Sequence, residues 1–277
     1  MGKSKLTASI VTYHDAEKIL KDTIDSFSIN CDNISSYLYI VDNSTNDSIN
    51  KLCNHQCTSY IFNNSNLGFG KAHNIAIQKA IELDSEYHLI LNPDVYFDSG
   101  VLKKLIRFMD NNQDVGLVMP KILYPNGDIQ YLCKLLPTPF DWIFRRFSPF
   151  KKSLAKRNEK YELRFTRYNK TMEVPSLSGC FMFIRTSVLQ EIGGFDERFF
   201  MYAEDVDLCR RIGEVSKTVY YPVVEITHNY EKGSYKNRKL LFYHIKSAIQ
   251  YFNKWGWIFD KGRKRINKKT LERLDYK

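Results

Sequence analysis

His88-Leu-Ile-Leu-Asn-Pro-Asp94 is the stretch of this 277-residue sequence that decides the fold. It continues an apolar run from Tyr87, and so short a run is typical of a buried parallel strand. Pro93 cannot donate to a ladder and holds the preceding residue extended, so the sheet should stop here. Asp94 would then lie at the carboxyl edge of the sheet, where a carboxylate suits a divalent metal beside a phosphate. The alternative is a turn that only closes a strand.

Apolar segments of strand length alternate with segments of helical periodicity on both sides of this stretch. This order predicts an α/β fold whose first half is a mostly parallel sheet. Tyr124-Pro-Asn-Gly-Asp128 predicts a tight hairpin. We expect strands over residues 6–12, 37–41, 59–62, 87–91, 115–119, 176–184 and 218–224, and helices over 16–27, 47–57, up to 83 after the glycines at 68 and 70, and over 99–109, 186–192 and 237–255.

Composition allows a large core and argues against several classes of protein. Hydrophobic residues make up 43% of the chain, yet no stretch approaches the roughly 18 to 20 apolar residues of a membrane span. The N-terminus runs directly into a strand-like segment, so we expect no signal peptide. The six cysteines are scattered without a second metal-ligand pair, which predicts reduced thiols in a cytosolic protein.

The net charge of +10 is unevenly distributed. Residues 145–170 carry ten Lys/Arg and two Glu, residues 232–277 carry fourteen Lys/Arg and three acids, and the remainder is net acidic. This pattern argues against a general nucleic-acid binder and favours local contact with an anionic partner, such as a membrane surface or a phosphate-bearing substrate. Ordinary solvated charge is the alternative. Residues 260–277, with eight Lys/Arg and three acids, should form a mobile basic tail.

Polar residues also follow the first two predicted strands. Thr12 and Tyr13 end the first and Asp42 ends the second, so with Asp94 they would line a nucleotide crevice. Asp42 could equally cap a turn. Gly68 and Gly70 make a poor dinucleotide fingerprint, because they follow the third strand and no third glycine completes it. They would instead let the backbone approach a ligand, with Lys71 and a helix N-terminus facing an anion.

The second informative stretch is Phe199-Phe-Met-Tyr-Ala-Glu-Asp-Val-Asp-Leu-Cys-Arg-Arg211. Its carboxylates open a helix that ends in arginines, which suits the helix dipole. However, Glu204 and Asp205 follow an aromatic run and should be partly desolvated, as a general base requires. His228 follows the strand over 218–224 and is a candidate additional metal ligand.

The order of these motifs resembles the family-two glycosyltransferases, which are inverting enzymes with a GT-A fold. Each motif is weak alone, but seven in order are a strong signal, from about residue 6 to 255. The matching pieces are Ile10-Val-Thr-Tyr13, Val41-Asp-Asn-Ser44, Asn66-Leu-Gly-Phe-Gly-Lys-Ala-His-Asn74, Leu91-Asn-Pro-Asp94, Ser178-Gly-Cys180, Gly193-Gly-Phe-Asp196 and Glu204-Asp-Val-Asp-Leu-Cys-Arg210.

The resemblance implies a role for each matching residue. Asn92-Pro-Asp94 stands where the family has Asp-x-Asp, which leaves Asp94, with His228, to hold Mg²⁺ or Mn²⁺. Asp205 matches the family's catalytic base, with Glu204 beside it. Gly179, Cys180 and Asp207 are the expected acceptor-binding residues. The expected nucleotide-sugar-binding residues are Thr12, Tyr13, Asp42, Asn66, Gly68, Lys71, Asn74, Asn92 and Asp94.

The same resemblance implies a division of the chain. A GT-A domain would occupy residues 1–259, with a nucleotide-sugar-binding half over about 1–120 and an acceptor and catalytic-base half over about 121–259. The second half would contain a basic, flexible or partly helical insertion near residues 137–175, and residues 260–277 would follow as the tail.

The variant motifs most resemble the rhamnosyltransferase-like branch of bacterial surface-polysaccharide biosynthesis, which builds O-antigen, capsule or cell-wall polymers. This implies transfer from dTDP-rhamnose, with UDP-hexoses next, to a saccharide hydroxyl, on an acceptor carried by a lipid diphosphate. The enzyme would be cytoplasmic, on the anionic inner face of the membrane, and would bind no nucleic acid. A nucleotide-binding oxidoreductase and a non-catalytic sugar-nucleotide-binding protein are the alternatives.

Overall fold

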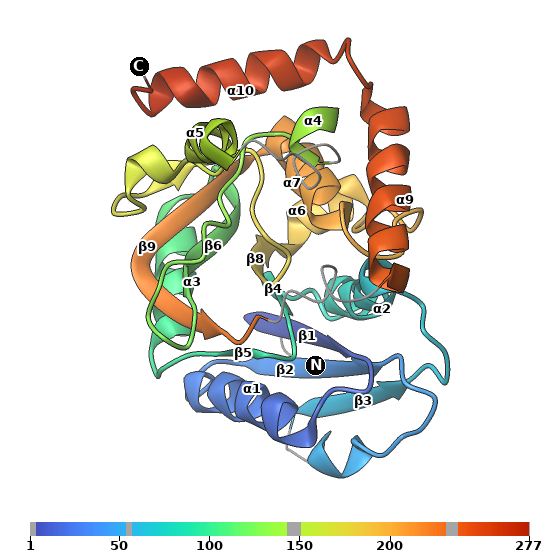
Figure 1. Cartoon of the computed structure of the whole chain (residues 1–277). Helices are drawn as coiled ribbons and strands as arrows, with labels where there is room; N and C mark the ends of the chain where they lie inside the picture. Colours follow the sequence, from blue (N-terminus) through green and yellow to red (C-terminus); the bar gives the residue numbers. More distant parts are fainter. Residues whose placement is uncertain (1–3, 54–56, 143–150, 231–237, 277) are drawn as a thin grey trace.

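A computed structural model describes residues 4–53, 57–142, 151–230 and 238–276. Within these residues, a nine-stranded sheet runs in the order β3-β2-β1-β4-β8-β6-β9-β5, and β7 pairs with β9 (Figure 1). The strands are β1 (Leu6–Thr12), β2 (Ser36–Asp42), β3 (Thr58–Phe62), β4 (Tyr87–Leu91), β5 (Val95–Tyr96), β6 (Val115–Leu123), β7 (Met172–Glu173), β8 (Phe181–Arg185) and β9 (Lys217–His228).

Helices lie on both faces of this sheet and above it (Figure 1). Helix α2 packs on β1 and β2, whereas α1 contacts α3 and β5. The helices are α1 (Glu17–Asn30), α2 (Phe69–Glu82), α3 (Val101–Asn111), α4 (Pro139–Trp142), α5 (Lys151–Tyr161), α6 (Thr186–Ile192), α7 (Glu204–Val215), α9 (Arg238–Trp255) and α10 (Lys261–Arg273), with 3-10 turns η1 (Asn50–Cys53) and η3 (Arg164–Thr166).

The first four strands form the parallel half that the sequence predicts. β1 is parallel to both β2 and β4, and β2 is parallel to β3. The register places Thr12 opposite Asp42, so the polar ends of β1 and β2 meet at one edge. β8 then runs antiparallel to β4 and β6, which makes the second half mixed. The predicted α/β class is therefore confirmed.

The chain returns to the sheet immediately after Asp94. β4 ends at Leu91, and β5 begins at Val95, so Asp94 lies between two strands rather than at the end of one. β5 is antiparallel to β9, with Val95 opposite His228. The backbone N–H of Asn229 also donates to the carbonyl of Asp94, at 2.9 Å. Two predicted metal ligands 134 positions apart are thus neighbours by strand register.

The predicted elements of the second half shift at their ends. β8 begins five residues later than the strand predicted from residue 176, whereas β9 extends to His228. The expected hairpin at 124–128 is present, because Gly127 N–H donates to the Tyr124 carbonyl at 2.9 Å. The insertion near 137–175 contains α4, α5 and β7; its residues 143–150, like 54–56 of the helix predicted over 47–57, lie outside the described residues.

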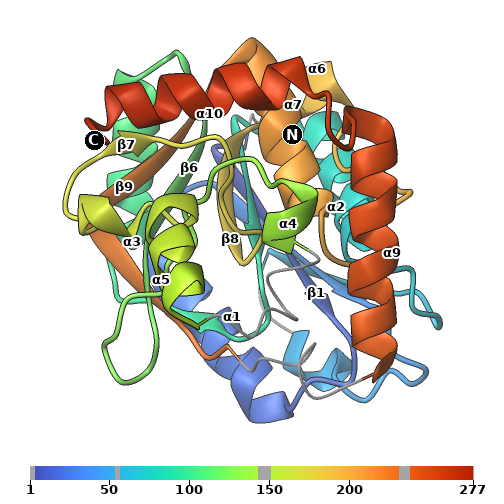
Figure 2. The ribbon, with the colours of Figure 1, turned by 45° about the horizontal axis from the view of Figure 1, so that its top comes forward.

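The prediction of a mobile basic tail is wrong. Residues 261–273 form α10, which Figure 2 shows along the top of the molecule with α4 and α5 below it in that view. Its inward side chains are buried or bonded: Asn267 exchanges two hydrogen bonds with the backbone of Leu136, at 2.8 and 2.9 Å. Asp260 begins the helix by accepting from the N–H of Arg263, and it pairs with the buried Arg210 at 2.7 Å. The sequence count of charges did not reveal these inward anchors.

Two fully buried histidines, His88 on β4 and His73 on α2, belong to one chain of hydrogen bonds. His88 Nδ1 lies 2.8 Å from Thr7 Oγ1, and its Nε2 lies 2.9 Å from Ser9 Oγ. The same Ser9 oxygen lies 2.7 Å from His73 Nδ1. Burial lowers the pKa of His88 to about 3, and burial together with His88 lowers that of His73. Both rings are therefore neutral in the folded protein at neutral pH.

This arrangement predicts that acid destabilises the fold through the two histidines. Their native pKa values lie below the unfolded value of about 6.5, so the unfolded chain binds more protons below that pH. The free energy of unfolding should fall with decreasing pH by up to about 1.4 kcal/mol per unit for each histidine. Denaturant unfolding of wild type and His88→Gln between pH 7.5 and 5.5 should show a shallower decline in the variant. Equal slopes would contradict the assignment, whatever the variant's absolute stability.

Candidate active site

Asp94 and His228 form the centre of the candidate site. His228 Nε2 lies 3.3 Å from Asp94 Oδ1, and both atoms are buried with no hydrogen bond of acceptable geometry. The other ring nitrogen, Nδ1, lies 3.0 Å from Gln130 Oε1, and Gln130 Nε2 donates to the His228 carbonyl at 2.8 Å. Because Gln130 Oε1 can only accept, Nδ1 must carry a proton. In the neutral ring, Nε2 then carries no proton, and its lone pair is available to bind a metal ion.

Burial and neighbouring groups have opposite effects on the pKa of His228. Burial lowers its pKa, but the nearby Cys180 and the Asp94 carboxylate raise it, to about 10 overall. Without a metal, the ring is therefore protonated and paired with Asp94 at neutral pH. A cation between the two side chains would replace that proton, because a ligating imidazole must be neutral. Oδ1 and Nε2, which face each other without a hydrogen bond, and the orienting Gln130 thus fit two ligand positions of a divalent metal.

Residues 178–180 connect this pair to the predicted catalytic carboxylates. Asn92 N–H donates to the Cys180 carbonyl at 2.9 Å. Next to it, the N–H of Gly179 donates to Asp205 Oδ2 at 3.0 Å. One short turn therefore contacts both the end of β4 and the start of α7. The structure brings together Asn92, Asp94, Gly179, Cys180, Asp205 and His228, all of which the sequence singled out.

The two carboxyls at the start of α7 differ in their partners. Asp205 accepts N–H groups of Gly179 and Val206, whereas Glu204 Oε2 is buried without a partner. Burial raises the pKa of both groups, and the charge of Asp205 raises that of Glu204 further. The backbone N–H groups oppose the rise at Asp205. Asp205 is therefore the proposed carboxylate of the pair, and Glu204, whose pKa the charge of Asp205 also raises, is the neighbour that takes up a proton more readily.

Several other predicted residues have structural partners. Asp42 is fully buried; its oxygens accept from Tyr60 Oη at 2.6 Å and from the N–H of Ser44 at 2.8 Å, so the turn-capping alternative is realised. Asp207 is also fully buried and is engaged by Arg211, Lys254 and Trp255. A side chain so enclosed cannot touch an acceptor, so we leave Asp207 out of the acceptor site.

The glycine segment before α2 approaches protein rather than an open space. A Cβ on Gly68, whose φ is +84°, would lie 2.3 Å from the Phe200 carbonyl oxygen. Asn66 Oδ1 accepts from the N–H of Gly68, while the amide of Asn74 holds both backbone groups of Phe195. The expectation that these glycines admit a ligand is therefore wrong for Gly68.

Two more of the predicted nucleotide-binding residues, Lys71 and Tyr13, are exposed to solvent, unlike the buried His228. Lys71 is half exposed and lies 3.7 Å from Glu197. Tyr13 is 47% exposed beside Thr12, whose hydroxyl donates to Asp15 Oδ2 at 2.8 Å. Burial raises the pKa of Asp15, with smaller contributions from Asp94 and Asp42, which marks an acidic crevice.

Gln130 and Asp15 were missed by the sequence analysis. Gln130 is 98 positions from the histidine it orients, and no motif surrounds it. Asp15 could have been found from its place three residues after Thr12 at a strand end.

Known proteins of similar sequence show the family to which the chain belongs. A model of the family described as "Glycosyltransferase like family 2" matches residues 4–247. The chain belongs to this family. It is 24% identical over 251 residues to rhamnosyltransferase WbbL of Escherichia coli, covering 87% of this chain and 90% of that protein. It is 30% identical over 179 residues to an N-acetylglucosaminyl-diphospho-decaprenol L-rhamnosyltransferase of Mycobacterium tuberculosis, covering 60% of this chain and 56% of the relative. The resemblance seen in the motifs is confirmed.

Solved structures support the GT-A fold. GalNAc-T7 with UDP, GalNAc and Mn²⁺ matches with a TM-score of 0.64 at 14% identity, covering 99% of this chain and 57% of that one. A Pyrobaculum calidifontis mannosyltransferase in complex with GDP-Man and Mn²⁺ matches with a TM-score of 0.57 at 14% identity, covering 99% and 76%. This protein is thus a glycosyltransferase of GT-A fold. Among the described residues, no helix is long and apolar enough to span a bilayer.

The site geometry makes Gly179 a sensitive position. A Cβ there would lie 3.2 Å from Asp205 Cβ, tighter than an ordinary contact. We expect Gly179→Ala to displace the Asp205 carboxylate and to lower the turnover number by roughly tenfold to a hundredfold, as misplacement of a reacting group does. The melting temperature should change by only a few degrees, since a backbone shift of a few tenths of an ångström at the start of α7 relieves the contact. Gly213→Ala, at a helical position on α7 where a Cβ would meet nothing within 4 Å, is the control variant for activity. Wild-type turnover in Gly179→Ala would contradict this geometry.

Proposed function

We propose that this glycosyltransferase inverts the anomeric centre of a nucleoside-diphosphate sugar, with dTDP-rhamnose favoured and UDP-hexoses next. The acceptor would be a saccharide hydroxyl in bacterial O-antigen, capsule or cell-wall assembly. The Asp94–His228 pair carries the proposal. Its two buried atoms, Oδ1 and Nε2, face each other without a hydrogen bond, and the turn at residues 178–180 connects the pair to the buried Asp205 carboxylate. The names of the two rhamnosyltransferases support the donor, and the decaprenol diphosphate in one name supports a lipid-diphosphate acceptor. Such an acceptor would place the enzyme at the inner face of the membrane.

A divalent ion, Mg²⁺ or Mn²⁺, would be held by Asp94 and His228 and would neutralise the leaving diphosphate as a Lewis acid. Gln130 keeps Nε2 of His228 aimed at that position. The two solved structures of similar fold both contain Mn²⁺, which supports this cofactor. Of the other predicted donor-site residues, Thr12, Tyr13 and Asn92 remain the proposed nucleotide-sugar contacts, while Asp42 would shape the crevice through Tyr60.

Asp205 would take the proton from the acceptor hydroxyl as its oxygen attacks the anomeric carbon. The glycosidic bond forms as the bond to the nucleoside diphosphate breaks on the opposite face, and the centre inverts. The Gly179 N–H fixes the carboxylate during this step. Burial and the charge of Asp205 raise the pKa of Glu204, so Glu204 would add little negative charge beside the base. Gly179 and Cys180 remain the proposed acceptor contacts.

The base assignment predicts different results for two isosteric substitutions. Asp205→Asn removes the proton acceptor and should lower turnover by roughly two to four orders of magnitude. Donor affinity should stay near the wild-type value, since the base does not hold the diphosphate. Glu204→Gln imitates the protonated neighbour and should retain most activity at neutral pH. Steady-state kinetics of both variants with one donor decide the assignment; near-normal turnover of Asp205→Asn would show it to be wrong.

The donor and metal assignments can be tested without turnover. At a hundredfold excess over the dissociation constant, dTDP-rhamnose with Mn²⁺ or Mg²⁺ should stabilise the fold by about 2.7 kcal/mol in thermal unfolding. Chelator, Asp94→Ala and His228→Ala should each remove most of this increment, whereas the exposed-loop variant Asp128→Ala should keep it. Saturable stabilisation by a UDP-sugar but not by dTDP-rhamnose would overturn the donor ranking. An undiminished increment in chelator would remove the metal, and stabilisation by NAD alone would favour the oxidoreductase alternative.

A further inference from the structure

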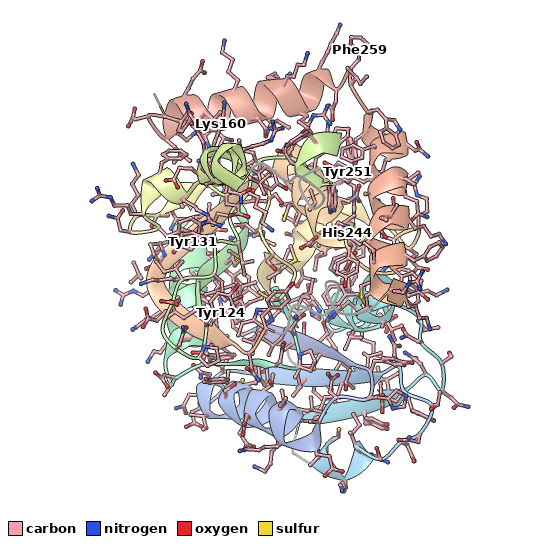
Figure 3. The ribbon with its side chains drawn as sticks, viewed as in Figure 1. Tyr124, Tyr131, Lys160, His244, Tyr251 and Phe259 are labelled. Carbon is pink, nitrogen blue, oxygen red and sulfur yellow. The ribbon has the colours of Figure 1, made fainter. Side chains whose placement is uncertain are left out.

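Three consecutive apolar residues project from the turn between α9 and α10. Trp257 is 40% exposed, Ile258 70% and Phe259 89%. Figure 3 shows Phe259 at the outer corner of the molecule, where the two helices meet. Contiguous exposed side chains of this size usually mark an interaction site.

The adjoining helix presents a basic outer face. Lys261, Lys264, Arg265 and Lys268 are exposed at spacings of three and four, so they share one side of α10. Among the described residues, no ion pair involves the first three, and Lys268 lies 3.7 Å from Glu272 in a solvated pair of little strength. The opposite side is fixed to the protein by Arg263, which donates to the Pro137 carbonyl at 3.2 Å.

The apolar tip is held in place relative to this basic face. Asp260, next to Phe259, is bonded through both carboxylate oxygens to the guanidinium of Arg210, at 2.7 and 2.8 Å. Arg210 in turn lies over the ring of Trp255, 4.0 Å from its centroid. The tip and the helix are therefore presented together as one rigid unit.

A cavity of about 980 Å³ opens behind the tip, between α10 and the segment of α4 and α5. Trp257 and Ile258 line it together with apolar residues such as Leu136, Phe140 and Leu271. Arg157 and Lys160 also line it, as do Lys264 and Lys268, which therefore lie where the outer face of α10 borders the cavity. Two acids, Asp141 and Glu272, line it as well and pair with Arg157 and Lys268. An apolar interior with an excess of cationic side chains fits an amphiphile that has an acyl chain and an anionic head.

We propose that residues 257–259 and the outer face of α10 form a membrane-docking surface for a leaflet that contains anionic phospholipid. The tip enters the boundary of the acyl region, the lysines and Arg265 face phosphates, and the cavity accepts an acyl chain. Nucleic acid would use the same cations but leaves the exposed tip unexplained. This surface is separate from the carboxylate site, so its test is independent of the proposed reaction.

The experiment is co-sedimentation of the full-length chain with vesicles of phosphatidylcholine alone or mixed with phosphatidylglycerol, without donor. Wild type should bind the anionic vesicles and be released as salt rises, because screening weakens the attraction. Ile258→Asp/Phe259→Asp should reduce the partition coefficient by roughly tenfold or more. Val223→Asp, at an exposed apolar position on β9, is the control for adding an acid.

Charge is tested by reversing two lysines on each of two helices. Lys261→Glu/Lys264→Glu should weaken binding and flatten its salt dependence, whereas Lys103→Glu/Lys104→Glu on α3, with the same change in net charge, should have a small effect. Bromine-labelled acyl chains should quench the fluorescence of wild type, and Trp257→Phe should lose most of that quenching. Equal binding by the tip variant and the Val223 control, or equal binding to neutral and anionic vesicles, would overturn the proposal. Thermal unfolding confirms that each variant is folded.

Discussion

The pairing of β5 with β9 is the constraint on which the site depends. β5 has two residues, yet its register sets Val95 opposite His228 and binds Asn229 to the carbonyl of Asp94. Proline at 93 ends β4 and allows the chain to turn into this pairing. Without it, the carboxylate and the imidazole would belong to separate parts of the sheet. A one-residue slip would carry the imidazole to the opposite face, because side chains alternate along a strand.

Residues 178–180 apply a second constraint. Their backbone bonds to Asn92 on one side and to Asp205 on the other, so the ends of β4 and α7 are held at a fixed separation. The donors and acceptors of this turn are backbone groups, which bond to the backbone of Asn92 and to the side chain of Asp205, and Gly179 permits the close approach. Burial then sets the protonation of the two acids at the start of α7. The hydrogen bond from Gly179 thus has two effects on Asp205: it positions the carboxylate, and it opposes the rise in pKa that burial causes.

The sequence predicted the parallel half well, because short apolar runs and their polar ends are local patterns. Asp94, Asp205 and His228 could be named for the same reason: each stands at the end of a predicted element. Gln130 could not, since its role arises from a contact between distant segments. Asp42, Asp207 and Gly68 were assigned to ligands from their places in the motifs, whereas their partners Tyr60, Trp255 and Phe200 come from packing between distant segments. The basic tail was misread because a count of lysines hides the inward positions of Arg263, Asn267 and Thr270.

The buried pair of Arg210 and Asp260 has a consequence for the integrity of the chain. Arg210 belongs to the helix that carries Asp205, and its partner lies 50 positions later, at the start of the last helix. Cutting the chain before Asp260 would remove the counter-ion of Arg210 together with the helix that covers its guanidinium, since a Cβ on Gly262 would lie 2.9 Å from Arg210 Nη2. Replacing Asp260 alone would instead leave the guanidinium buried without its counter-ion, which typically costs about 3 to 5 kcal/mol, a large part of the roughly 5 to 15 kcal/mol of an ordinary domain. The C-terminal helix is therefore tied by a buried ion pair to the helix that carries Asp205, so a change at Asp260 would reach the candidate site without any contact with lipid.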